Sequence, residues 1–100
     1  MKELEWTFHA RAKMNFYRLS EGRIRRVIKT PERVEEGIAE GTIALMQPQG
    51  QGKREHEIWT MVRDLGDRRR VISAWRYPGR TVPGEPLPEE ILKEFREAIF

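Results

Sequence analysis

The stretch EHEIWTMVRDLGDRRRVISAWRY, residues 55–77, decides the fold. Its apolar runs flank the segment DLGDR, in which the Gly66-Asp67 pair suits a tight hairpin turn. We therefore predict two antiparallel strands, Glu55–Arg63 and Arg69–Tyr77. Alternation along the second strand predicts one face with Val71, Ser73, Trp75 and Tyr77 and the opposite face with Ile72, Ala74 and Arg76.

Two more strands are expected upstream of this hairpin. After Pro31 the β-branched content rises, and Gly41 separates the candidate strands Arg33–Ile38 and Thr42–Gln47. The segment QPQGQGK, residues 47–53, is polar and rich in glycine, which predicts a mobile loop. The opening ELEWTF alternates polar and apolar residues, so we expect it to form a short strand or a strap across the core.

The N-terminal third has the apolar spacing of helices. Residues 9–19 place Ala10, Met14 and Tyr17 on one side of a helix. Residues 21–30 follow, with Ser20 as the N-cap and Pro31 as the stop. A last helix is expected from Pro88 onward. The predicted fold class is α+β, one domain over residues 1–100: two N-terminal helices packed on a twisted antiparallel sheet of about four strands, plus a C-terminal helix.

Composition excludes several kinds of protein. The chain has 100 residues, enough for one domain, and no cysteine, which removes disulfides, thiolate nucleophiles and cysteine-ligated metals. It begins without the apolar run of a secretory signal, and no stretch approaches the roughly 18 apolar residues of a membrane span. We therefore expect a cytoplasmic protein without a membrane partner.

Positive charge is concentrated in two segments of the chain. The net charge is only +3, but residues 9–29 and 58–80 are both strongly basic, whereas residues 32–40 and the C-terminal tail are acidic. Arginine outnumbers lysine 14 to 5, and arginine is the better bidentate partner for phosphate. Nucleic acid is therefore a candidate ligand. The alternative is that a surface rich in arginine and glutamate serves only solubility or heat resistance.

Three motifs carry a family resemblance. HARAKM at residues 9–14, IKTPERV at 28–34 and RVISAWRYP at 70–78 resemble the bacterial and archaeal domain-of-unknown-function family 4258 over about residues 8–77. The loop and helix of residues 78–100 lie outside it. That family looks distantly related to the RelE/ParE-like and BrnT-like toxin folds. The resemblance implies a metal-independent ribonuclease that acts through basic and aromatic side chains and is neutralised by an antitoxin partner.

The candidate catalytic residues follow from the chemistry of RNA cleavage by the 2′-hydroxyl. The reaction needs a base, an acid and fixed positive charge at the phosphate. His9 and Lys13, four residues apart on one helix face, could supply acid/base action and a phosphate anchor. Arg63, Arg76 and Tyr77 would stabilise charge and hold a base. Five further arginines are candidate contacts to nucleic acid: Arg11, Arg18, Arg25, Arg26 and Arg80.

Less specific interpretations stay open beside this one. His9 could simply cap or staple its helix while Lys13 is solvated, and Trp59 and Trp75 are most simply core residues. His56 invites a metal hypothesis, but ligands at suitable spacing are missing, so we expect neither a metal nor a cofactor. The chain could also be a non-catalytic domain that binds nucleic acid or an acidic antitoxin-like protein, as a monomer or homodimer.

Overall fold

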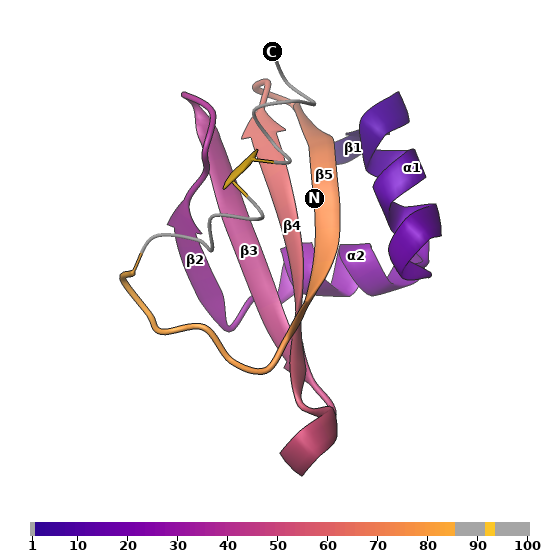
Figure 1. Cartoon of the computed structure of the whole chain (residues 1–100). Helices are drawn as coiled ribbons and strands as arrows, with labels where there is room; N and C mark the ends of the chain where they lie inside the picture. The colour runs from indigo at the N-terminus through magenta and orange to yellow at the C-terminus, as the bar shows by residue number, and fades with distance from the viewer. Residues whose placement is uncertain (1, 86–91, 94–100) are drawn as a thin grey trace.

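The computed structural model describes residues 2–85, 92 and 93. It contains two helices and a five-stranded sheet in the order β1-β5-β4-β3-β2 (Figure 1). The strands are β1 (Glu3–Trp6), β2 (Arg33–Glu36), β3 (Thr42–Gln49), β4 (His56–Asp64) and β5 (Arg68–Pro78). The two α-helices are α1 (Phe8–Tyr17) and α2 (Glu21–Lys29), and a short 3₁₀ turn, η1 (Gly52–Arg54), precedes β4. The α+β class is confirmed. The C-terminal helix expected from Pro88 lies outside the described residues, except for Leu92 and Lys93.

The sheet differs from the prediction at one edge. β2, β3, β4 and β5 pair antiparallel, as expected, but β1 adds a fifth strand that runs parallel to the first half of β5. The four predicted antiparallel strands are therefore present, and the opening segment, expected as a short strand or a strap, adds a parallel fifth strand that the predicted sheet did not include. Parallel pairing needs a long connection between the two strands, and the chain from α1 to β4 provides it.

Local signals place both helices. The Thr7 hydroxyl caps α1 by accepting a hydrogen bond from the Ala10 backbone N–H at 3.0 Å, and Ser20 caps α2 through the Arg23 N–H at 3.0 Å. Thr7, not His9, is thus the N-cap of the first helix. α1 ends at Arg18, whose left-handed φ of 57° closes the helix through hydrogen bonds to the Asn15 and Met14 carbonyls.

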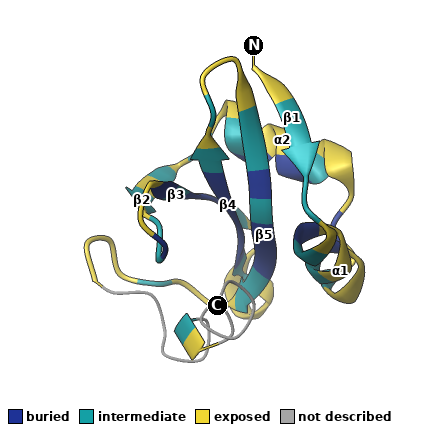
Figure 2. Cartoon of the chain, turned by 90° about the horizontal axis from the view of Figure 1, so that it is seen from above, coloured by how far each residue is buried: buried dark blue, intermediate teal, exposed yellow. Residues whose placement is uncertain are grey.

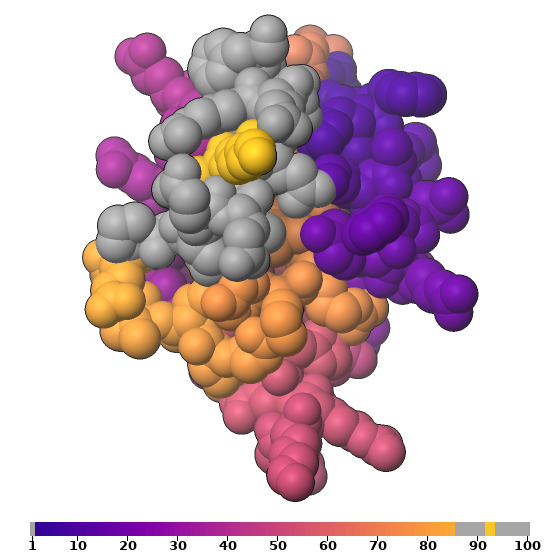
Figure 3. Space-filling model, viewed as in Figure 1, coloured from indigo at the N-terminus to yellow at the C-terminus, as the bar shows by residue number. Residues whose placement is uncertain are grey.

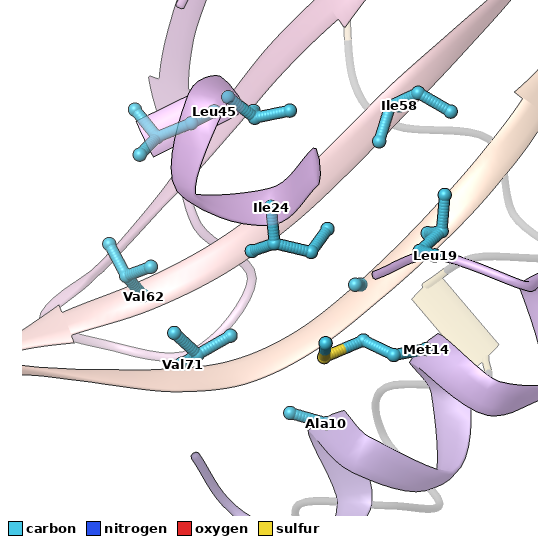
Figure 4. Close-up of a cluster of buried hydrophobic side chains, with 10 residues drawn as sticks. Ala10, Met14, Leu19, Ile24, Leu45, Ile58, Val62 and Val71 are labelled. Carbon is cyan, nitrogen blue, oxygen red and sulfur yellow. The ribbon is translucent and has the colours of Figure 1, made fainter. Parts of the chain in front are cut away.

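The helices bury one face of the sheet. α1 packs against β5, and α2 packs against β4 and β3. The cluster between the layers joins residues of both helices to the inner faces of three strands: Ala10, Met14, Leu19, Ile24, Val27, Leu45, Ile58, Val62, Val71 and Ala74 (Figure 4). Ala10 and Met14 of the predicted apolar stripe of α1 therefore face this core. Each large aliphatic side chain that is fully buried here, such as Ile24 or Val71, stabilises the fold by roughly 1.5–3 kcal/mol.

The other face of the sheet carries a second buried cluster. It contains Ala44, Met46, Trp59, Met61 and Trp75, with the two indole rings stacked at 5.6 Å. The segment after β5 crosses this side, opposite α2 (Figures 1 and 2). Both tryptophans are therefore core residues, which agrees with the simpler interpretation of their role.

A bulge in β5 changes which side chains share a face. The pairing shifts between Met61 and Val62, so Val62 pairs with Val71 and Met61 with Ser73, which leaves Ile72 as an extra residue. Val71 consequently joins Ala74 on the helix side, contrary to the simple alternation predicted. The bulged Ile72 carbonyl accepts the Thr7 hydroxyl at 3.1 Å, which ties the start of α1 to β5.

Candidate nucleic-acid-binding cleft

A cleft opens where α1 ends beside the ends of β4 and β5. Its cavity volume is about 320 Å³, and its lining comprises Tyr17, Lys53, Arg54, Glu55, His56, Arg76, Pro78 and Gly79. The segment around η1 projects beyond the rest of the molecule next to the end of β5 (Figure 3). Two cationic side chains of η1, Lys53 and Arg54, are thereby exposed on one wall.

Arg76 and His56 form the centre of the cleft. Nη1 of Arg76 lies 2.6 Å from Nε2 of His56, and Nη2 donates to the Tyr17 carbonyl at 3.1 Å. Nδ1 of His56 lies 2.8 Å from the Arg54 carbonyl oxygen. A guanidinium only donates and a carbonyl only accepts, so these partners assign the proton to Nδ1 and the lone pair to Nε2. In this tautomer the unprotonated nitrogen of His56 faces Arg76.

The electrostatic field around the cleft is positive. Arg23 of α2 has its pKa lowered by burial first, and then by repulsion from Arg26 and Arg76. Within residues 2–85, 92 and 93, neither Arg23 nor Arg76 has a carboxylate within ion-pair distance. The acidic residue of the lining, Glu55, is paired with Arg80 at 2.9 Å. The positive charges of Arg23 and Arg76 beside the cleft are thus not neutralised by any carboxylate of the part of the chain that the structure describes.

Tyr17 connects the cleft to α1. Burial raises the pKa of its hydroxyl, so the group stays protonated at neutral pH and remains a proton donor. One turn earlier, the Lys13 ammonium lies 6.0 Å from the Tyr17 ring centroid. Burial lowers the pKa of Lys13.

The predicted pair of His9 and Lys13 lies on α1 beside β5, not in the cleft. Nε2 of His9 contacts the Ser73 hydroxyl at 3.2 Å, and the pKa of His9 is lowered first by burial and then by the charge of Lys13. The charge of Lys13 therefore acts on His9, as the helical spacing predicts. Ser73 is only 2% exposed, so this histidine–serine contact offers no nucleophile to a substrate.

The other three candidate catalytic residues point to different places. Arg63 donates a hydrogen bond to the Glu40 carbonyl at 3.2 Å. It lies about 16 Å along β4 from Ile58, the residue that pairs with Arg76 across the hairpin. Arg76 shares the helix side with Ile58, whereas Tyr77 packs against the Trp59 cluster on the opposite face. Of the proposed catalytic set, the cleft therefore contains Arg76.

The five arginines expected to contact nucleic acid are engaged in various ways. Arg11 and Arg25 both lie 5.5 Å from the ring centroid of Trp6. Arg80 is bound to carboxylates of Glu32, Glu55 and Glu57. Arg18 and Arg26 are exposed, and the charge of Arg26 reaches Arg23 beside the cleft.

Sequence reasoning missed His56 as a partner of Arg76. The hairpin register was the available signal, because pairing of Ile58 with Arg76 puts His56 diagonally across on the same face. Tyr17 and η1 had no such signal, since only the tertiary fold brings them to this end of the strands.

Three comparisons bear on family and function. The chain matches no family model, no curated protein and no solved structure. The resemblance to family 4258 therefore stays a prediction. Among residues 2–85, 92 and 93, no cluster of three potential metal ligands occurs and no helix is long and apolar enough to cross a membrane.

Proposed function

We propose that this protein binds RNA at the cleft around Arg76 and His56 and cleaves its phosphodiesters without a metal ion. The observation that carries the proposal is the 2.6 Å contact between Nε2 of His56 and the Arg76 guanidinium, in a cationic cleft. A phosphate is the natural partner for Arg76, which lines the cleft and has no carboxylate within ion-pair distance among the described residues.

The proposed reaction uses the hydrogen bonds of His56. A phosphate that accepts from Arg76 leaves Nε2 of His56 free to take the proton of the neighbouring 2′-hydroxyl. The 2′-oxygen then bonds to phosphorus as the bond from phosphorus to the 5′-oxygen breaks. Tyr17 donates a proton to the leaving 5′-oxygen, and Arg76 stabilises the charge on the pentacoordinate phosphorus. The products are a 2′,3′-cyclic phosphate and a 5′-hydroxyl end.

The Arg54 carbonyl has a supporting role in this scheme. It accepts the Nδ1 proton of His56 at 2.8 Å and so keeps the basic lone pair on Nε2. Lys53 and Arg54, both exposed on η1, extend the positive surface along the path of a bound strand.

The test is cleavage of end-labelled RNA in EDTA. We expect His56→Ala and Arg76→Gln to lower the rate by at least about a hundredfold while circular dichroism shows that each variant is folded. Arg68→Gln, which changes an exposed arginine at the far end of β5, is the matched control. His9→Ala and Lys13→Ala test the histidine–lysine pair on α1. Cleavage that is equal in all proteins would refute the catalytic role, and a loss confined to the last two would move the site to α1.

The second candidate function is binding without cleavage, either of nucleic acid or of an acidic antitoxin-like protein. The positive cleft supports it equally well, because binding needs charge but no proton transfer. RNA affinity would then fall steeply with salt. Arg76→Gln would reduce the slope of log K against log salt by about 0.7 for each phosphate of a single strand that the variant no longer neutralises.

A further inference from the structure

One exposed aromatic side chain borders the cleft. Phe16 is 75% exposed, so most of its ring faces solvent. Its ring meets that of Tyr17, which lines the cleft, edge to face at 4.8 Å. This contact places the Phe16 ring next to a residue of the cleft lining.

A positive charge accompanies this ring. The Lys13 ammonium lies 5.8 Å from the Phe16 ring centroid and 6.0 Å from that of Tyr17. Arg18, the next residue but one after Phe16, is also exposed. Aromatic rings bordered by cations are the surfaces on which proteins stack unpaired bases while they hold the neighbouring phosphates.

We infer that Phe16 is a stacking platform for one unpaired base, so that the cleft selects single-stranded over duplex RNA. The inference rests on the proposed RNA binding at Arg76 and adds the class of substrate. A duplex keeps its base faces stacked on each other, so it cannot cover the Phe16 ring, whereas a single strand anchored by phosphate at Arg76 can turn one base onto it.

Phe8 provides an internal comparison on the same helix. It is 91% exposed, but it lies at the other end of α1, about 12 Å from Phe16 along the axis. The residue that α1 contributes to the cleft lining is Tyr17, next to Phe16 and far from Phe8. Phe8→Ala therefore removes the same kind of apolar surface as Phe16→Ala without touching the platform.

Fluorescence anisotropy tests the inference with three probes of about twelve nucleotides: a single-stranded RNA, its duplex, and an abasic strand with the same backbone. The wild-type protein should bind the single strand tightest. Phe16→Ala should weaken that binding about tenfold and leave the abasic strand unchanged, and Phe8→Ala should change neither. Arg76→Gln should weaken binding of all three probes.

The outcomes separate the two proposals. If Arg76→Gln weakens binding while Phe16→Ala binds the single strand as the wild type does, the stacking platform is refuted and RNA binding stands. Tighter binding of the duplex would also refute the platform. If none of the probes binds, both proposals fail.

Discussion

Glu57 should be the most costly polar residue to replace, because its carboxylate is completely buried on the face of the sheet that carries the Trp59 cluster. Oε1 accepts hydrogen bonds from Nε1 of Trp59 at 2.9 Å and from the Thr81 hydroxyl at 2.7 Å. Oε2 accepts from the Thr81 backbone N–H at 3.1 Å and from Nε of Arg80 at 3.3 Å, and it lies 3.7 Å from Nη1 of Arg33. One carboxylate thus joins β4 to β2 and to the segment after β5.

Glu57→Gln keeps the shape but removes the charge and turns an NH₂ group toward groups that already donate. Removing one partner of a buried ion pair costs about 3–5 kcal/mol. We expect about 3 kcal/mol, the low end, because Arg33 keeps its pair with Glu35 at 3.1 Å and Arg80 is 40% exposed and retains other carboxylates. Since a domain of this size has about 5–15 kcal/mol of stability, the loss is a large fraction.

Urea unfolding followed by tryptophan fluorescence measures this change, because Trp59 and Trp75 are buried beside the carboxylate. In thermal unfolding followed by the same fluorescence, the melting temperature of Glu57→Gln should fall by about 12–24 °C. Glu36→Gln, at an exposed position of β2, is the matched control and should change the stability by less than about 0.5 kcal/mol. Thr81→Val, which removes one donor, should cost about 1–2 kcal/mol and tests the network if Glu57→Gln does not fold. A loss below about 1 kcal/mol for Glu57→Gln would refute the reasoning.

Three other predictions concern stability in urea. Gly37→Ala should cost about 1–3 kcal/mol, because an added Cβ would lie 2.7 Å from the Thr42 backbone carbon. Its control is Gly22→Ala in α2, where the added Cβ would lie 3.9 Å from the Ser20 hydroxyl, so this change should be neutral or stabilising. Arg18→Gly should stabilise the protein by about 0.5–1 kcal/mol, since φ is 57° there, and a lower stability would contradict the strain. Because the pKa of His9 is lowered in the folded protein, the unfolded chain binds more protons than the folded one just below pH 6.5. The stability should therefore fall as the pH drops from about 8 to about 5, and it should fall less in His9→Gln. An equal fall in both proteins would contradict this assignment.

Local sequence signals predicted much of the fold. Ser20 and Pro31 bound the second helix as expected, and the Gly66 turn joins the central hairpin with a φ of 81°. Ala10 and Met14, four residues apart on the first helix, both face the core, as their spacing predicts. These features depend on hydrogen bonds and side-chain periodicity within a few residues, so they are readable from one segment at a time.

The candidate site was only partly readable. The sequence identified basic segments and singled out Arg76, and the helical spacing of His9 and Lys13 correctly predicts that they interact. The predicted strand bounds also put Arg63 at the hairpin end of its strand and Arg76 near the far end of the next one, and the register of the hairpin confirms this separation.

What the sequence alone determined is therefore the α+β class, both helices with their buried faces, the N-cap of the second helix, the hairpin, and the segregation of charge. Only the tertiary structure decided the parallel pairing of β1 with β5, the bulge at Ile72, the buried position of Glu57 and the meeting of Tyr17, His56 and Arg76. The physical reason is range. Strand partners, bulges and clefts are settled by how distant segments pack together, and a pattern within one segment is compatible with several such packings.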